Sequence, residues 1–309
     1  MPFLRALGCY LPPQIVTNAE LAPRVASDPE WIWQATGIAE RRFAALEQSV
    51  VDLGVLAARD CLENSRIAAS QIGCLIVASG SAEGRFPGPA AVIGAALGIP
   101  GAPALDLPLA SAGSLFGICL ASQLAPVYRN VLVIGTEIMS RVIRIDAEGR
   151  DTAILFGDGA GACVVSADGG FAEIHDFLLA SDGNFAGALQ LPCDAPLHMD
   201  GKTVILHAAR KLPRVIQDLL ERNRRLPGEV GTFLLHQANR NLITRVAQSL
   251  HVPQERFFCN LDRYGNTSSA SLLIAAAEWQ RTARPNSGAP LILAAFGAGF
   301  HWGAALAIQ

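Results

Sequence analysis

The stretch Leu105-Asp106-Leu107-Pro108-Leu109-Ala110-Ser111-Ala112-Gly113-Ser114 reads as a strand that runs directly into a helix of small residues. A strand followed at once by a helix is the building unit of α/β folds, and here it presents Ser111 at the helix N-terminus. The partial positive charge at that end favours a nucleophile or an oxyanion. Ser111 is therefore our candidate nucleophile. Ser114 is an equally placed candidate. The alternative to catalysis is that Ser111 is only a small residue that packs at a crowded helix start.

Short, continuously apolar runs recur on both sides of this stretch, as in strands buried on both faces. The predicted strands are 74–78, 131–134, 162–165, 233–235 and 291–295. Apolar residues at helical spacing predict helices over 50–65, 202–225 and 242–250. Strands that alternate with helices predict an α/β fold with covered sheets. Residues 291–308 are apolar enough for a membrane helix, but their glycines favour a strand, a turn and a second strand.

A weak internal repeat predicts two related halves. Phe156-Gly157-Asp158-Gly159 in the first half resembles Phe296-Gly297-Ala298-Gly299 in the second. Each of these motifs follows a segment in which a predicted strand ends at a polar residue beside a predicted helix start. That residue is Ser111 in the first half and His236 in the second. The turn cluster 166–170 predicts the boundary between the halves 1–168 and 169–309.

Composition excludes some classes of protein. The net charge of −3 argues against a non-specific nucleic-acid binder. Only 17% of the residues are charged, below the usual quarter, so we expect a partner subunit to cover part of the surface. The seven cysteines form no Cys-x-x-Cys pair and no cluster with histidine, which predicts reduced thiols in a cytoplasmic protein and no metal site. The N-terminus has no signal-peptide pattern, and we expect no membrane partner.

Two further segments offer polar groups that could complete a site with Ser111. His236 follows the strand 233–235, and a side chain at a strand end reaches the crevice where open α/β sheets bind ligands. It could act as a base for Ser111 or as a donor to a carbonyl oxygen, or it could be a histidine satisfied at a turn. Asn266 precedes a small-residue helix and could cap that helix or donate its amide to an enolate.

The ordered set of motifs resembles the β-ketoacyl-acyl-carrier-protein synthase III family over nearly the whole chain. The matching segments are Trp31 with 36–41, the Ser111 segment, 156–162, 199–202, His236-Gln237-Ala238-Asn239, 265–268 and 300–303. The resemblance implies a thiolase-like five-layered α-β-α-β-α fold, built from two pseudo-repeated halves, in a homodimer. It also implies that acyl-coenzyme A is a substrate, that no cofactor is needed and that an acyl carrier protein is a partner.

The resemblance also implies roles for individual residues. Ser111 falls on the nucleophile that takes the acyl group, and His236 and Asn266 match the pair that decarboxylates malonyl-carrier protein. The backbone N–H groups of Ser111 and Ala298 match the oxyanion hole. Four further residues match substrate contacts. Trp31 matches the residue that stacks on adenine, and Arg150 matches the residue that assists there. Phe156 matches the gate of the acyl pocket, and Phe86 matches the residue whose ring enters the acyl pocket of the partner subunit. The two rings favour a short acyl group.

The sequence departs from the family pattern in two places that matter for partners. Ala35 stands where the family often has an arginine near the coenzyme phosphates. Asn241 and Gln248 stand where basic residues commonly meet the carrier protein, and Arg240 and Arg245 are neighbouring substitutes. Carrier-protein identity and use are therefore open.

The larger departure is Ser111, because the family has cysteine there. Oxygen esters are poorer acceptors for carbanions than thioesters, and serine needs a base in contact. Three explanations remain open: a cysteine changed to trap a ligand, a natural serine variant, or a poorly active partner of an intact homologue. The predicted function is acyl transfer from acyl-coenzyme A to Ser111 and decarboxylative condensation with malonyl-carrier protein, in fatty-acid or polyketide initiation. The alternatives are an acyltransferase that uses Ser111 without condensation and a non-catalytic partner subunit.

Overall fold

The computed structural model describes residues 1–84, 86–99, 101–282 and 288–309. The strands are β1 Phe3–Tyr10, β2 Gln14–Thr17, β3 Glu40–Phe43, β4 Cys74–Ala78, β5 Ala104–Leu107, β6 Asn130–Glu137, β7 Gly159–Ser166, β8 Ala172–Ser181, β9 Leu189–Gln190, β10 His198–Met199, β11 Thr232–Leu235, β12 Phe257–Phe258, β13 Pro290–Gly297 and β14 His301–Ile308. The helices are α1 Asn18–Leu21, α2 Pro29–Thr36, α3 Val50–Ser65, α4 Pro89–Ala96, α5 Gly113–Tyr128, α6 Arg150–Ala153, α7 Gly201–Arg222, α8 Arg240–Ser249, α9 Leu261–Tyr264 and α10 Ser271–Thr282.

The main sheet has the strand order β12-β11-β13-β14-β8-β1-β7-β6-β4-β5. The sheet consists of two five-stranded parts, which read from their outer edges are β12-β11-β13-β14-β8 and β5-β4-β6-β7-β1. When the strands of each part are numbered along the chain, both parts have the same order, 3-2-4-5-1. They meet where β1 and β8 pair antiparallel through Phe3 with Glu173 and Leu4 with Ala172. The boundary predicted at 168/169 falls in the turn between β7 and β8.

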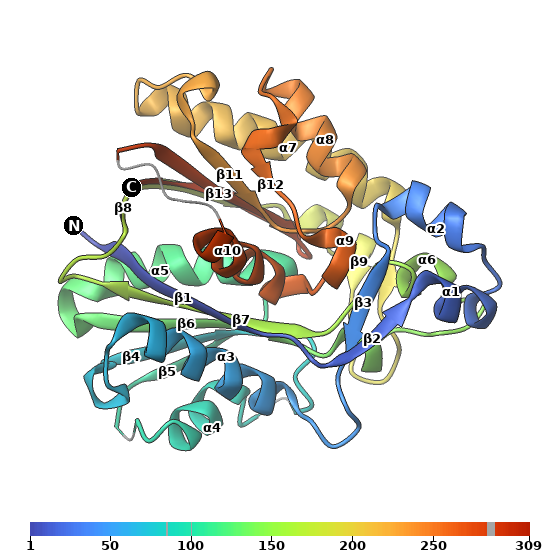
Figure 1. The fold of residues 1–309 in the computed structure, drawn as a ribbon, viewed down its shortest axis with the longest axis horizontal. Coiled ribbons are helices and arrows are strands. Elements are labelled where there is room, and N and C mark those ends of the chain that lie inside the picture. The colour runs from blue at the N-terminus through green and yellow to red at the C-terminus, as the bar shows by residue number, and fades with distance from the viewer. Residues whose placement is uncertain (85, 100, 283–287) are drawn as a thin grey trace.

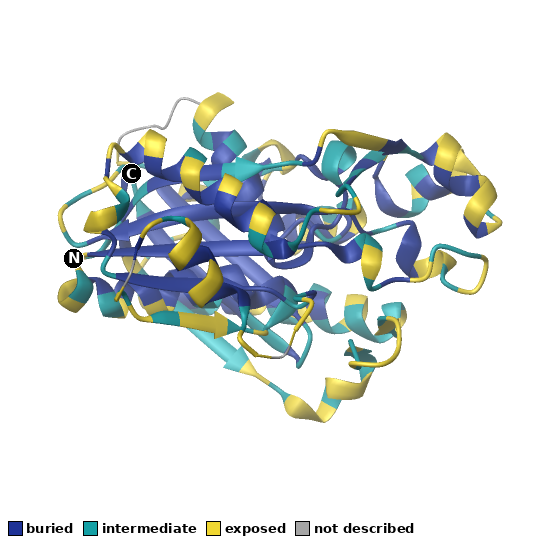
Figure 2. Ribbon diagram, turned by 90° about the horizontal axis from the view of Figure 1, so that it is seen from below, coloured by how far each residue is buried: buried dark blue, intermediate teal, exposed yellow. Residues whose placement is uncertain are grey.

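The chain forms five layers, as the resemblance implied. In Figure 1, α3 and α4 lie below the sheet part that contains β1, β4, β5, β6 and β7, and α7 and α8 lie above the part that contains β11, β12 and β13. Helices α5 and α10 lie between the two parts. The central apolar core contains residues of both helices and of both sheet parts, while each outer helix pair has a separate core against its own part. Figure 2 shows buried strands at the centre of the molecule and exposed residues mainly on peripheral segments, while β5 and most of β8 are only partly buried or exposed.

The two central helices begin with matching turns that touch. A 3₁₀ turn, Ala110–Ala112, leads into α5, and another, Ser268–Ala270, leads into α10. The first residue of each has a positive φ, 45° at Ala110 and 47° at Ser268, which is a costly conformation for a residue with a Cβ. Ser114 on α5 donates its hydroxyl to the carbonyl of Ser269, so the second half buttresses the helix that carries Ser111.

Gly135 on β6 allows this close meeting of the two turns. A Cβ there would lie 2.4 Å from the Ser114 hydroxyl and 2.5 Å from the Ser269 carbonyl oxygen. Only glycine leaves room for the two turns to approach the strand. The sequence at this point is thus fixed by packing between the halves.

The apolar tail folds as a strand, a turn and a strand, which confirms that prediction. Strands β13 and β14 pair antiparallel from Pro290 with Ile308 to Gly297 with His301. Within the described residues, one helical stretch, Ala110–Tyr128, has the length and composition of a membrane span, but 61% of its apolar window is buried inside the protein. That stretch is the α5 helix of the central layer together with the turn before it.

Candidate active site

Ser111 lies at the bottom of two adjoining cavities. The first cavity, of about 80 Å³, is mostly apolar and is lined by Ser111, His236, Asn266 and Phe156 together with other residues. The second, of about 200 Å³, is lined by Ser111, Ala298 and Phe156 together with other residues. Ser111 is 8% exposed, His236 7% and Asn266 6%. The structure therefore brings the three predicted side chains to one enclosed place, although they come from three distant segments.

The surroundings of Ser111 and Ser114 favour Ser111 as the candidate nucleophile. Ser114 is fully buried and its hydroxyl is committed to the Ser269 carbonyl. It lines neither of the two cavities. Ser111 lines both of them, so Ser111 is the residue that a substrate would meet.

The turn between β13 and β14 lies against the backbone of Ser111. A Cβ on Gly297 would lie 2.7 Å from the Ala112 nitrogen and 3.2 Å from the Ser111 nitrogen, so no larger residue fits there. Ala298 follows Gly297 and faces the same cavity as Ser111. An oxyanion hole needs two backbone N–H groups directed at one oxygen, and the shared cavity of Ser111 and Ala298 is compatible with that role. The oxyanion role of Ser111 and Ala298 stays a prediction.

Asn266 is held by backbone and side-chain bonds. Its N–H donates to the Leu155 carbonyl at 2.8 Å and its carbonyl accepts from the Gly157 N–H at 3.0 Å, which ties it to the Phe156 segment. Its side-chain oxygen accepts from the Ser268 N–H at 2.9 Å. This bond holds the side-chain amide against the 3₁₀ turn Ser268–Ala270, which precedes α10. Its Nδ2 has no partner among the described residues and is left to donate into the cavity.

His236 directly follows β11, as predicted. Its backbone N–H donates to the Ala294 carbonyl at 2.9 Å, which continues the pairing of β11 with β13. Its Nδ1 lies 2.5 Å from the Ser271 hydroxyl. Burial lowers the pKa of His236 to about 3, so the ring is neutral at physiological pH.

An outer cavity of about 800 Å³ lies beyond the inner one. Trp31 and Arg150 line it, and the Arg150 guanidinium lies 5.2 Å from the centre of the Trp31 ring. The outer and inner cavities share five lining residues: Leu155, Met199, Gly201, Ile205 and Asn239. The outer cavity is thus the approach from solvent to Ser111.

Phe86 lies away from these cavities within the described chain. Its side chain is 88% exposed, and it lines none of the cavities around Ser111. The prediction that this ring serves a partner subunit therefore stays a prediction. Phe156, by contrast, is 4% exposed and lines both inner cavities.

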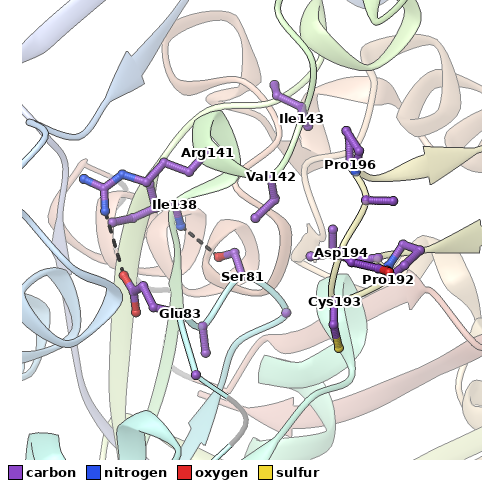
Figure 3. A pocket seen from close by; sticks show the side chains of 15 residues that line it. Ser81, Glu83, Ile138, Arg141, Val142, Ile143, Pro192, Cys193, Asp194 and Pro196 are labelled. Carbon is purple, nitrogen blue, oxygen red and sulfur yellow. Dashed lines mark hydrogen bonds and ion pairs between the residues drawn. The ribbon is translucent and has the colours of Figure 1, made fainter.

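A further cavity of about 560 Å³ opens next to the second inner cavity and shares Gly80 and Leu191 with it. Figure 3 shows its two walls, one from Ser81 and Glu83 with the segment 138–143, the other from the segment 192–196. The Ser81 hydroxyl accepts from the Ile138 N–H at 2.9 Å, and the Arg141 guanidinium lies 3.9 Å from the Glu83 carboxylate. No pattern in the sequence predicted this cavity.

The site contains no cluster of metal-binding side chains in the described ranges. The cysteines of the described residues form no disulfides, and burial raises the pKa of the Cys119 and Cys163 thiols well above the ordinary thiol value. The polar side chains that line a cavity together with Ser111 are the neutral imidazole of His236, the amides of Asn266, Asn239 and Gln190, and the hydroxyl of Ser268. Such a set binds developing negative charge on oxygen. This defines a class of protein: an α/β enzyme whose chemistry passes through an oxyanion or an enolate.

Comparison with known proteins identifies the family. The model of 3-oxoacyl-[acyl-carrier-protein (ACP)] synthase III matches residues 105–183, and the model of its C-terminal part matches residues 220–308. The β-ketoacyl-[acyl-carrier-protein] synthase III 1 of Vibrio vulnificus strain YJ016 is 40% identical, covering 97% of this chain and 96% of the relative. The β-ketoacyl-[acyl-carrier-protein] synthase III of Solibacter usitatus is 36% identical, covering 98% and 97%.

Solved structures agree with this result. The 3-oxoacyl-[acyl-carrier-protein] synthase III of Aquifex aeolicus has a TM-score of 0.96 and 32% identity and covers both chains completely. The priming β-ketosynthase of the R1128 polyketide pathway has a TM-score of 0.92 and 30% identity, covering 100% of this chain and 96% of the other. The chain belongs to the 3-oxoacyl-[acyl-carrier-protein] synthase III family and is an enzyme of the acyltransferase class.

Proposed function

We propose that the protein transfers an acyl group from acyl-coenzyme A to Ser111 and condenses it with malonyl-carrier protein, as the first step of a fatty-acid or polyketide chain. The observation that carries the proposal is the shared cavity of Ser111, His236 and Asn266 in a chain of this family. In the first step the Ser111 oxygen attacks the thioester carbonyl, the carbon–sulfur bond breaks, and the hydroxyl proton passes to solvent or to the departing thiolate, so that an ester forms at Ser111 and the coenzyme leaves. The N–H groups of Ser111 and Ala298 stabilise the oxyanion.

In the second step the malonyl group loses carbon dioxide. The carbon–carbon bond breaks, and its electron pair moves onto the thioester oxygen to form an enolate. His236 and Asn266 donate to that oxygen. The enolate carbon then attacks the acyl-enzyme carbonyl, a new carbon–carbon bond forms, and Ser111 leaves as the hydroxyl after it takes up a proton from solvent.

The outer cavity supports coenzyme A as the acyl donor. A flat indole at Trp31 offers a stacking surface for adenine, and the adjacent Arg150 carries positive charge. Lys202 and Arg245 also line this cavity and could replace the arginine that is missing at Ala35. The acyl group would occupy the 200 Å³ cavity beyond Ser111, where Met139 and Phe156 leave room for a short chain. Arg240 and Arg245 on α8 would meet an acidic carrier protein.

We further propose a homodimer in the cytoplasm. Strand β5 lies at one edge of the main sheet, with its outer edge unpaired among the described strands. Leu105 on β5 is 44% exposed, and Leu120 and Val127 on α5 are 41% and 73% exposed. Unpaired strand edges and clustered apolar side chains favour association. A second copy is the occupant that the family favours, and it would bring Phe86 toward the site.

Ser111 gives specific support to a second function, acyl transfer without condensation. An oxygen ester at Ser111 is a weaker acceptor for the enolate than the family's thioester. An acyltransferase would instead pass the acyl group to a carrier protein or to another hydroxyl or amine. The geometry of the first step is the same for both functions, so the second step separates them.

Incubation with acyl-coenzyme A and intact-mass measurement tests the first step. We expect an added mass equal to the acyl group, located at Ser111 and lost in Ser111→Ala. Release of carbon dioxide from malonyl-carrier protein together with a β-ketoacyl product supports condensation, whereas transfer of the acyl group without carbon dioxide supports the acyltransferase. An unchanged mass, with no effect of Ser111→Ala on any turnover, would leave only the non-catalytic subunit.

A further inference from the structure

The hydrogen bonds around Ser271 determine which nitrogen of His236 carries the proton. The Ser271 hydroxyl is buried at the start of α10 and accepts from the Gln237 backbone N–H at 3.1 Å. The same oxygen lies 2.5 Å from Nδ1 of His236. A serine hydroxyl has one proton to donate, and no other acceptor contacts this oxygen within the described chain. The hydroxyl proton is therefore left for Nδ1.

The neighbouring residue holds this arrangement in place. The Gln237 side chain donates to the Leu235 carbonyl at 2.8 Å, and its side-chain oxygen accepts from the Asn260 N–H at 3.2 Å. The backbone on both sides of His236 is thus fixed, which aims the Gln237 N–H at Ser271. A ring that accepts at Nδ1 and stays neutral must carry its proton on Nε2.

We propose that Ser271 is a positioning residue, whose hydroxyl fixes His236 as the Nε2–H tautomer, so that the ring acts as a hydrogen-bond donor and not as the base of Ser111. This inference rests on the proposed function only for its catalytic consequence. The Nε2 atom has no partner among the described residues, and the ring lines the cavity that Ser111 and Asn266 also line. Nε2–H and the Asn266 amide then form a pair of neutral donors toward the substrate oxygen.

The fixed tautomer has a consequence for the nucleophile. When Ser111 attacks a thioester, its hydroxyl proton must leave, and Nε2 already holds a proton and cannot take another without charging a buried ring. The proton must pass to solvent or to the departing thiolate. A cysteine would avoid this step, because a thiol at a helix N-terminus loses its proton before attack. We therefore expect Ser111 to be loaded more slowly than a cysteine at the same position would be, while the proposed donors for decarboxylation are in place.

The first test is spectroscopic and does not depend on activity. The full-length protein carries ¹⁵N-labelled histidine, and the signals of His236 are those that disappear in His236→Gln. We expect the unprotonated nitrogen to be Nδ1, and we expect Ser271→Ala to give a mixture of tautomers, with Ser271→Thr close to the unchanged protein. An unprotonated Nε2 in the unchanged protein would overturn the proposal.

The second test measures decarboxylation of malonyl-carrier protein. We expect Ser271→Ala to lower kcat by about tenfold, the value of roughly one hydrogen bond, with KM little changed and with recovery in Ser271→Thr. Ser269→Ala is the matched control, since its buried hydroxyl donates to the Ala78 carbonyl at 2.9 Å and does not touch His236. Equal losses in Ser271→Ala and Ser269→Ala contradict a positioning role. If Ser271→Ala does not fold, the spectrum of the unchanged protein and the kcat of Ser271→Thr decide.

Discussion

At the scale of single residues, the site is a set of neutral donors gathered around one hydroxyl. Asn266 and His236 each have one polar atom occupied by a neighbour, Ser268 or Ser271, and the other left for the cavity. Donors that are already oriented in this way need little reorganisation energy when negative charge develops on a substrate oxygen. The chemistry of the site therefore depends on the partners of the two side chains as much as on the side chains themselves.

Asn266→Ala should separate the two steps of the reaction. The variant loses a donor to the enolate, so we expect decarboxylation of malonyl-carrier protein to fall by about 10²–10³-fold. Acyl loading does not use this amide, so the mass added at Ser111 should change little. Decarboxylation and acyl loading are measured in the same preparation of the variant, so each step serves as the control for the other. Equal losses in the two steps would contradict the assigned role.

The neutral His236 predicts a particular dependence of stability on pH. Its folded-state pKa is about 3, below the ordinary value of 6.5, so the unfolded chain binds the proton more readily. Its contribution to stability is complete above pH 6.5 and is lost as the pH falls toward 3. Between pH 6 and pH 4 we expect the free energy of unfolding to fall more steeply in the unchanged protein than in His236→Gln, by up to about 1.4 kcal/mol per pH unit. Denaturant unfolding at both pH values measures this, and parallel curves would contradict it.

The sequence predicted residue identities better than their hydrogen-bond partners. Ser111, His236 and Asn266 could be selected because each lies beside a recognisable strand or helix start. Nothing local to Ser271 indicates its contact with His236, because 35 positions separate the two residues and only the fold joins them. The cavity walls at Gly297 and Leu189 were missed for the same reason.

At the scale of elements, regular segments were predicted well where their burial was simple. The strands predicted at 74–78, 131–134, 162–165, 233–235 and 291–295 correspond to β4, β6, β7, β11 and β13, and the helix predicted at 50–65 is α3. Strands β1 and β8 were missed. In β8 only two of the ten residues are buried, so its sequence lacks the continuous apolar run that identified the other strands.

The turn between β13 and β14 is the element on which the nucleophile depends most. Gly297→Ala would place a methyl group against the Ala112 and Ser111 nitrogens and push the oxyanion N–H groups apart. We expect acyl loading to fall by at least about 100-fold, with a loss of about 1–3 kcal/mol in stability. Gly228→Ala is the control, because a Cβ at Gly228 meets nothing within 4 Å. Loading by Gly297→Ala at the rate of Gly228→Ala would contradict this placement.

At the scale of the whole molecule, the composition predicts that a partner subunit covers part of the surface, and this stays a prediction. Leu105 on β5 and Leu120 and Val127 on α5 are among the exposed large apolar residues that such a subunit could cover. We expect Leu105→Lys to convert the dimer to a monomer, because a lysine resists edge-to-edge pairing. Light scattering measures the mass, and Leu226→Lys, which changes an exposed leucine far along the chain, is the control. A monomer in the unchanged protein would contradict the dimer.

The equal strand order of the two sheet parts has a consequence for how this enzyme could be divided. The first part holds Ser111 and the second holds His236, Asn266 and Ala298, so neither fragment owns a complete reaction centre. A chain separated between β7 and β8 would yield two pieces that each expose one side of the central helix layer. Enzymatic activity would be recovered only when the two fragments reassociate, which makes this fold a candidate for fragment complementation.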